Sequence, residues 1–98
     1  MSLPFEHHAQ KFMNWSAEVF PLATKESSLK KLEEKVREVK MSWDAEEYTD
    51  CIMCLLHSAK AAGWEWEDLE AAFARKRKKN AHERKWIFDE QTKTYRHE

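Results

Sequence analysis

The amino-acid sequence predicts an all-α protein, a compact domain built from four helices. Apolar residues recur three or four positions apart in four separate stretches, the spacing that places side chains on one face of an α-helix. Glycine occurs once and proline twice among 98 residues, a composition that disfavours β-hairpins, sandwiches and low-complexity disorder. We therefore expect one domain over residues 1–98, with a helical core at about 5–86 and a polar tail at 87–98.

The first helix is expected to lie between two prolines. Pro4 suits a first helical turn, and Pro21 disfavours helical conformation at Phe20, so the helix should end there. Its predicted core-facing stripe is Phe5, His8, Phe12, Trp15 and Val19. Because these residues follow the helical repeat, the sequence places them on one face of the helix.

The second helix is expected over about 29–41, after a connector at 21–28. Ser27 or Ser28 is suited to cap its N-terminus, because a serine hydroxyl accepts a hydrogen bond from an otherwise unpaired backbone N–H. The apolar stripe of this helix is Leu29, Leu32, Val36 and Val39. A short link, Met41-Ser42-Trp43, then leads into the next helix.

The third helix begins at a predicted capping box, in which Asp44 is followed three residues later by Glu47. Its apolar stripe is Tyr48, Cys51, Ile52, Leu55, Leu56 and Ala59. The one glycine, Gly63, stands where a left-handed C-terminal cap is wanted. The third helix should therefore end just before Gly63.

The fourth helix is expected over about 66–85, with Leu69, Ala72 and Phe73 facing inward. Its second half is strongly basic, because Arg75-Lys76-Arg77-Lys78-Lys79 is followed by Arg84-Lys85. The net charge of the chain is nevertheless only −1, and the acidic residues concentrate before residue 71. Overall charge therefore does not favour a nucleic-acid partner.

Composition also bears on location and assembly. No apolar run approaches the roughly 18 residues needed to cross a bilayer, and the N-terminus lacks the features of a signal peptide. Two cysteines alone do not form a secreted disulfide framework, so we expect a protein of the reducing cytoplasm. Five tryptophans and five phenylalanines exceed what so small a core hides, which predicts a homo-oligomer, a dimer or tetramer.

Two pairs of acidic residues are the candidate metal ligands of the sequence. Glu34 and Glu38 are spaced i,i+4, and Glu47 and Asp50 are spaced i,i+3, so each pair projects from one helical face. Two facing helices would bring the four carboxylates together around Mg²⁺ or Mn²⁺, which prefer oxygen ligands. The alternative is a solvated face, in which these acids pair with neighbouring lysines and Glu47 only caps its helix.

The motifs Glu34-Lys-Val-Arg-Glu38 and Glu47-Tyr-Thr-Asp50 resemble the paired acidic motifs of the MazG-like, all-α nucleoside triphosphate pyrophosphohydrolases. Within that superfamily the sequence is most similar to the small phage and bacterial dATP/dGTP pyrophosphohydrolases. The similarity also includes Trp15-Ser16 followed by Phe20 in the first helix, and Lys79-Asn80 followed by Arg84-Lys85-Trp86. It spans about residues 5–86.

The resemblance implies hydrolysis of a purine (deoxy)nucleoside triphosphate, of the dGTP or dATP type, to monophosphate and pyrophosphate. It implies Mg²⁺ or Mn²⁺ as cofactor, with Glu38, Glu47 and Asp50 as ligands and Glu34 as a ligand or a catalytic base. Residues implied in substrate binding are Lys76, Lys79, Asn80 and Arg84 for the phosphates and Trp15 for stacking on the base.

Two features depart from the family pattern. Three residues rather than two separate Asn80 from Arg84, with no proline after Trp86, and the first acidic motif is altered at Lys35. The family has a ligand glutamate where this chain has Lys35. Either Glu34 takes over that role, or Lys35 pairs with the acids, lowers their charge and reduces the number of ions held. A catalytically impaired, nucleotide-binding homologue is therefore an alternative function.

Two further interpretations of the sequence assign the protein a function that needs no active site. One is a helical protein-interaction module, which would use neither metal nor nucleotide. The other is a nucleic-acid binder that uses the basic block with Trp86 and Tyr95, which the neutral net charge disfavours. Cys51 and Cys54 are interpreted as packing residues, because they lie inside a helix and lack a full set of zinc ligands.

Overall fold

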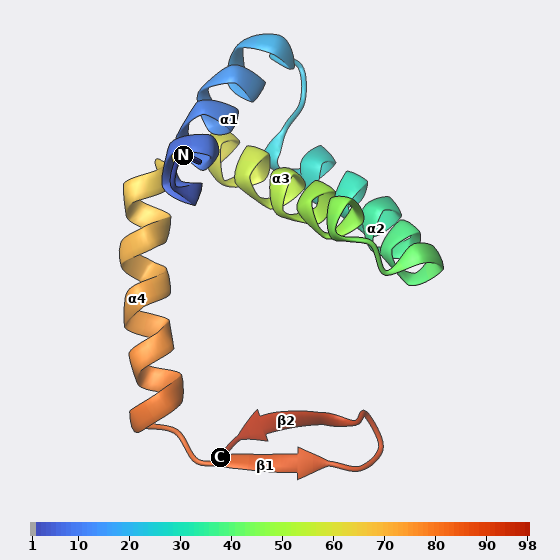
Figure 1. The fold of residues 1–98 in the computed structure, drawn as a ribbon, viewed down its shortest axis with the longest axis vertical. Helices are drawn as coiled ribbons and strands as arrows, with labels where there is room; N and C mark the ends of the chain where they lie inside the picture. Colours follow the sequence, from blue (N-terminus) through green and yellow to red (C-terminus); the bar gives the residue numbers. More distant parts are fainter. Residues whose placement is uncertain (1) are drawn as a thin grey trace. The chain divides into compact units, whose positions relative to one another are not determined.

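A computed structural model describes residues 2–98 and contains four helices and a two-stranded sheet (Figure 1). The elements are α1 (Phe5–Val19), α2 (Lys25–Ser42), α3 (Ala45–Ala61), α4 (Trp66–His82), β1 (Trp86–Asp89) and β2 (Thr94–His97). The chain divides into two compact units, the first ending at Trp66 and the second comprising Glu67–Glu98. The all-α class is confirmed by the helices, and the hairpin is an addition to it. None of the helices described is long and apolar enough to cross a membrane.

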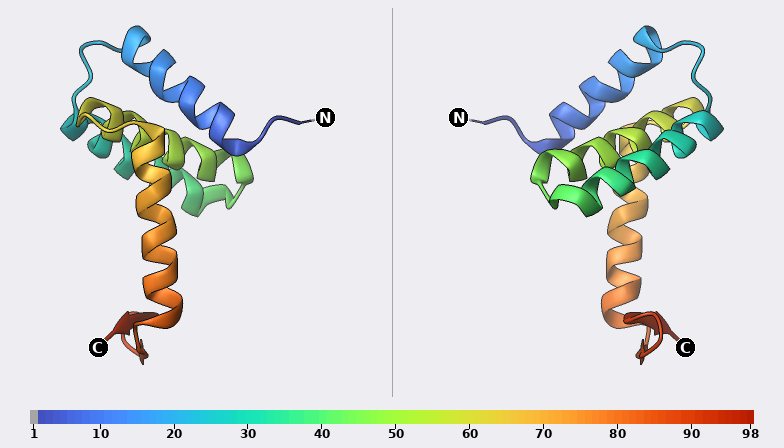
Figure 2. Two further views of the ribbon diagram at one scale, coloured as in Figure 1. Left: turned by 90° about the vertical axis from the view of Figure 1, so that its left-hand side faces the viewer. Right: turned by 90° about the vertical axis from the view of Figure 1, so that its right-hand side faces the viewer.

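The first unit is a three-helix arrangement. Helices α2 and α3 run antiparallel and side by side, and α1 packs against α3 (Figure 2). The turn between α2 and α3 is tight because Trp43 adopts a left-handed conformation with φ 60°. The Trp43 N–H donates to the Val39 carbonyl at 2.7 Å, which closes the last turn of α2. This turn fixes the end of α2 directly beside the start of α3.

The buried face of α1 is not the predicted aromatic stripe. Ala9, Met13 and Ser16 are the buried residues of α1, whereas Phe5 and Trp15 are about half exposed. Small side chains such as alanine and serine allow two helix backbones to approach closely, and larger rings are displaced to the margins of the contact. The predicted core-facing stripe of α1 was therefore wrong: the buried face is the adjacent one, rotated around the helix axis.

The second helix is capped differently from the sequence prediction. Helix α2 begins at Lys25, because Thr24 accepts a hydrogen bond from Ser27 N at 3.0 Å and Thr24 N donates to Ser27 Oγ at 2.8 Å. Thr24, rather than Ser27 or Ser28, is thus the N-cap, and Ser27 completes a reciprocal capping box. The connector after α1 shortens accordingly to residues 20–24.

The ends of α3 match the prediction in part. Asp44 is the N-cap, but its side chain makes no capping hydrogen bond, so the predicted capping box with Glu47 does not form. Gly63 follows the helix with φ +99° and donates its N–H to the Lys60 carbonyl at 3.0 Å. The predicted glycine cap is confirmed, since only glycine adopts such a φ without strain.

The second unit comprises most of α4 and a β-hairpin in place of the predicted polar tail. Helix α4 ends at His82, and none of its residues is buried, Phe73 being 74% exposed. Strands β1 and β2 pair antiparallel from Trp86↔His97 to Asp89↔Thr94. The inward placement predicted for Phe73 and the absence of a hairpin were therefore both wrong.

The hairpin has clear physical causes. The Phe88 and Tyr95 rings form a cross-strand pair at 5.1 Å, a contact that stabilises antiparallel strands. At the turn, Asp89 Oδ1 accepts hydrogen bonds from the backbone N–H groups of Gln91 and Thr92. Lys93 takes the left-handed conformation there, with φ 59°. Aspartate side chains often initiate turns in this way, which offsets the lack of glycine.

Candidate functional site

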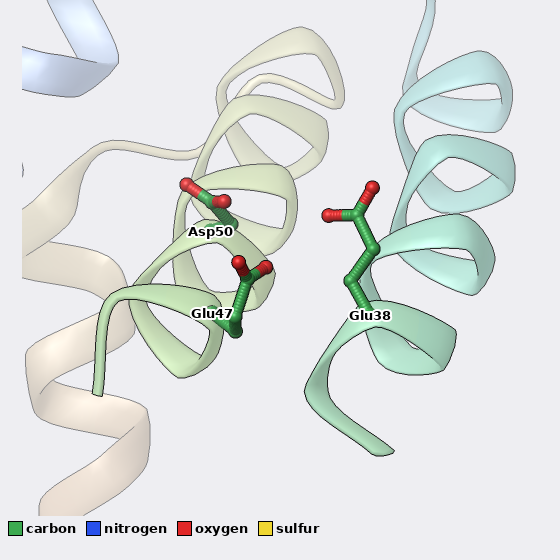
Figure 3. Close-up of side chains that lie close together, drawn as sticks. All are labelled: Glu38, Glu47 and Asp50. Carbon is green, nitrogen blue, oxygen red and sulfur yellow. The ribbon is translucent and has the colours of Figure 1, made fainter. Parts of the chain in front are cut away.

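Three of the four predicted acids converge between α2 and α3. Glu38, Glu47 and Asp50 each offer a carboxylate oxygen, and these oxygens lie within 4.8 Å of one another. In Figure 3 the Glu38 side chain extends from α2 toward the two side chains from α3. We call these three residues the acidic cluster.

The sequence produces this cluster through the tight turn at Trp43. Glu38 lies one turn before the end of α2, and Glu47 lies in the first turn of α3. Asp50 follows Glu47 at the i,i+3 spacing, so both point from the same face of α3. The antiparallel pairing of the two helices then brings this face opposite Glu38.

Glu47 is the most constrained member of the acidic cluster. Its Oε2 atom is buried and has no hydrogen-bond partner among residues 2–98. Burial, followed by the nearby carboxylates of Glu38 and Asp50, raises the pKa of Glu47 above its usual value. A buried, unpaired carboxylate oxygen among like charges is unfavourable unless a cation binds it.

Lys35 supplies a fixed positive charge to the acidic cluster. Its Nζ lies 3.2 Å from Glu38 Oε2 and 3.7 Å from Asp50 Oδ2. The hydrogen bond with Glu38, together with the charges of Glu38, Asp50 and Glu47, raises the pKa of Lys35. One ammonium among three carboxylates leaves a formal excess of two negative charges, the charge that one divalent cation neutralises.

Glu34 does not join the acidic cluster. Its carboxylate pairs with Lys31 Nζ at 3.0 Å, and its side chain is 53% exposed. This hydrogen bond and the charge of Lys31 lower the pKa of Glu34. Glu34 therefore follows the alternative of a solvated acid paired with a lysine, while the other three acids gather.

A cavity of about 520 Å³ adjoins the acidic cluster in the first unit. Its lining residues are Phe12, Trp15, Phe20, Ala23, Ser27, Ser28, Lys31, Lys35, Asp50, Met53, Cys54 and His57. Asp50 and Lys35 thus belong to both the cavity and the contacts around the acidic cluster. The Trp15 and Phe20 rings meet edge-on at 5.4 Å, so Trp15, predicted to stack on a base, lies in this wall.

Cys54 contributes a neutral side chain to the cavity. Burial is the main cause that raises the pKa of its thiol, so the thiol stays protonated at neutral pH. Cys51 and Cys54 are both free of disulfides. These observations agree with the interpretation of both cysteines as packing residues.

The predicted phosphate-binding residues belong to the second unit. Lys76 and Asn80 line a hollow of about 450 Å³ together with Phe73, Arg77, Ala81 and Trp86. Arg84 Nη1 donates to Asn80 Oδ1 at 2.9 Å, and Trp86 Nε1 donates to the Asn80 carbonyl at 2.7 Å. Lys79 lies on the same helix but does not line the hollow.

Sequence reasoning did not assign Phe20, Lys31 or His57 to the substrate site, although all three line the cavity. Phe20 entered only as the end of the first helix and as part of the Trp15-Ser16…Phe20 pattern of the family resemblance. His57 follows Glu47, Asp50 and Cys54 by 10, 7 and 3 positions. This helical spacing already indicated that the four residues share one face of α3. The signal for Lys31 is weaker, since nothing separates it from other lysines of α2.

The chain matches a family model described as dATP/dGTP pyrophosphohydrolase over residues 8–97, which includes both units. Comparisons with curated proteins and with solved structures found no significant match.

Proposed function

The chain belongs to the dATP/dGTP pyrophosphohydrolase family, and from this premise we propose that it hydrolyses dGTP or dATP to the monophosphate and pyrophosphate. The observation that carries the proposal is the position of the acidic cluster at the edge of an aromatic-lined cavity. Triphosphate chemistry needs cations held by carboxylates, and a purine base needs an apolar, aromatic wall. Such a substrate belongs to the cytoplasmic nucleotide pool, where we place the activity.

Mg²⁺ or Mn²⁺ fits the acidic cluster. The three donors are hard carboxylate oxygens from Glu38, Glu47 and Asp50. Glu47 also has a buried oxygen that finds no hydrogen-bond partner within the described residues 2–98. When bound, such an ion neutralises charge on phosphate oxygens and lowers the pKa of a coordinated water. These three residues would hold it.

The remaining side chains of the cavity position the substrate. Lys31 and Lys35 would neutralise phosphate oxygens, since both residues line the cavity. Trp15 and Phe20 would stack on the purine base. A role for Glu34 as a ligand or base requires its carboxylate to leave Lys31, and a Glu34→Gln variant tests that role.

We also propose phosphate-binding roles for the cations of the second unit, Lys76, Lys79 and Arg84, with Asn80 as a hydrogen-bonding partner. Their charge and the hydrogen bond between Arg84 and Asn80 support this assignment, since a guanidinium fixed by an amide is well suited to bind phosphate oxygens. Lys76 and Lys79 would add positive charge on the same helix. Substitution of each residue by alanine should raise KM for the triphosphate more than it lowers kcat.

A homo-oligomer, dimer or tetramer, is also proposed. Tyr48, Ile52 and Leu55 recur at helical spacing on α3 and are between 39% and 49% exposed. An apolar stripe of this kind on a helix favours burial against a second copy. Light scattering coupled to size-exclusion chromatography measures the size of the assembly.

Product analysis by chromatography tests the proposed reaction. The protein is incubated with each of the eight common NTPs and dNTPs in Mg²⁺ or Mn²⁺, beside the variants Glu38→Ala and Glu33→Ala. Glu33→Ala is the matched control, because Glu33 is exposed on the same helix and lies outside the acidic cluster. Monophosphate and pyrophosphate from purine deoxynucleotides, lost only in Glu38→Ala, is the expected result. Full activity of Glu38→Ala would refute the site.

The position of Lys35 supports a second candidate function, in which the protein binds nucleotides but hydrolyses them poorly. Its ammonium occupies space among the carboxylates and pairs with two of them. Thermal stabilisation by Mn²⁺ with dGTP, without any product, would support this candidate. A helical interaction module would show neither stabilisation nor product.

A further inference from the structure

His57 is a buried imidazole that the proposed reaction does not use. It lies near the end of α3 and is 9% exposed. Both ring nitrogens are buried without a hydrogen-bond partner among residues 2–98. Buried polar atoms in proteins almost always have such partners, so this side chain calls for a ligand or a structural reason.

The surroundings of His57 indicate a ligand. The residue lines the cavity of the first unit, where its ring meets Phe20 edge-on at 6.0 Å. The contact with Phe20 is apolar and satisfies neither nitrogen. A group that hydrogen-bonds His57 would therefore lie against an aromatic ring, in a cavity whose lining also includes the charged residues Lys31, Lys35 and Asp50.

Most other polar side chains of the cavity already have partners within the chain. Ser27 Oγ and Ser28 Oγ both donate to the Thr24 carbonyl. Lys31 and Lys35 are held in ion pairs, and Asp50 is paired with Lys35. Among the buried side-chain nitrogen and oxygen atoms of this lining, as described for residues 2–98, only the two ring nitrogens of His57 lack a partner.

The hydrogen-bonding capacity of an imidazole narrows the choice of ligand. In its neutral form an imidazole offers one N–H donor and one acceptor nitrogen, which suits a purine edge that carries donors and acceptors side by side. Phosphate oxygens only accept and would be drawn to Lys31 and Lys35 instead. We propose that His57 is the specificity-determining residue that hydrogen-bonds the edge of the purine base. This inference rests on the proposed function, and it names the residue that recognises the purine base of the substrate, which is called base reading below.

The first test uses the unaltered protein. Imidazole nitrogen resonances are recorded by NMR with Mg²⁺, before and after addition of an α,β-imido analogue of dGTP or dATP, and separately with inorganic tripolyphosphate. The His57 signal is assigned from its loss in His57→Gln. A shift of the His57 nitrogens with the nucleotide analogues but not with tripolyphosphate is expected. No shift with a bound nucleotide analogue would overturn the proposal.

The second test compares two variants kinetically. His57→Phe keeps a flat ring and removes both hydrogen-bonding atoms, whereas His57→Gln keeps a donor and an acceptor. We expect KM for dGTP and dATP to rise about 10- to 100-fold in His57→Phe with kcat little changed, and to stay within about threefold in His57→Gln. An unchanged KM in His57→Phe would refute base reading, as would an equal loss of tripolyphosphate binding.

The two proposals fail differently. Turnover by the wild type with an unaltered His57→Phe variant would refute base reading alone. Absence of both turnover and nucleotide binding in the wild type would refute the proposed function together with this inference. Because the NMR test needs only the wild type and His57→Gln, a His57→Phe protein that fails to fold does not prevent a decision.

Discussion

Glu47→Gln is the substitution that most directly tests the acidic cluster. It removes one negative charge from three crowded carboxylates while keeping the size of the side chain. The metal-free variant should be more stable than the wild type at neutral pH, because the raised pKa of Glu47 shows that the folded protein disfavours its ionised form. The same change should weaken binding of Mn²⁺, which needs the ionised carboxylate.

The size of the metal effect follows from linkage. With Mn²⁺ at about 100 times its Kd, the wild type should gain about 2.7 kcal/mol, or a Tm increase of about 10–20 °C for a domain of this size. Loss of a ligand should weaken binding about 100-fold, by comparison with the effects of changes around metal sites. At the same Mn²⁺ concentration the variant would then gain only about 2–3 °C.

The pH dependence has a defined sign. A carboxyl group whose folded pKa is raised adds stability below its unfolded pKa, and that stability is lost as pH rises through the folded pKa. The Tm advantage of metal-free Glu47→Gln over the wild type should therefore be larger at about pH 7.5 than at about pH 5. Taking the difference between the two proteins removes the contribution of other titrating groups.

Differential scanning calorimetry with and without Mn²⁺ measures both effects. Glu46→Gln is the matched control, because Glu46 precedes Glu47 on α3, is exposed and carries the same charge. The control should keep the full Mn²⁺ shift and show no gain without metal. The reasoning would be refuted by a Glu47→Gln protein that keeps the wild-type Mn²⁺ shift.

Three other substitutions test separate features of the structure. Lys35→Glu should tighten Mn²⁺ binding about tenfold in calorimetric titration, because it replaces a competing ammonium with a carboxylate; weaker binding would give Lys35 a role of its own. Met13→Ala should cost about 2–4 kcal/mol in urea unfolding, since Met13 is 1% exposed, whereas the control Met41→Ala, at 86% exposed, should change stability by less than about 0.5 kcal/mol. Similar losses in both methionine variants would contradict the assignment of the core. Ser58→Ala removes the 2.8 Å hydrogen bond from Ser58 Oγ to the Lys25 carbonyl and should cost about 1 kcal/mol in the same urea assay; no loss would show that water replaces this contact.

The sequence was sufficient for features that depend on local geometry. Helical periodicity located all four helices, and Pro4, Pro21 and Gly63 marked ends because their backbone preferences act within one or two residues. The i,i+3 spacing of Glu47 and Asp50 likewise fixed their common face. These properties are encoded within a single turn of the chain.

Choices between neighbouring faces were beyond the sequence. The buried face of α1 is Ala9, Met13 and Ser16, whereas the apolar pattern favoured the adjacent stripe containing Phe12 and Trp15. Hydrophobicity ranks side chains by their transfer from water, but how closely helices approach depends on the shape of the partner surface. That surface comes from α3 and is absent from a local pattern.

The helices, the acidic motifs and the family resemblance could all be recognised in the sequence. The folded arrangement was needed to show that Lys35 pairs with Glu38 and Asp50 and that Glu34 pairs with Lys31. It was also needed to show that His57 is buried without a hydrogen-bond partner among residues 2–98. The reason is that spacing along a helix fixes the direction of a side chain, whereas its charge partner and its burial depend on what the facing helix presents.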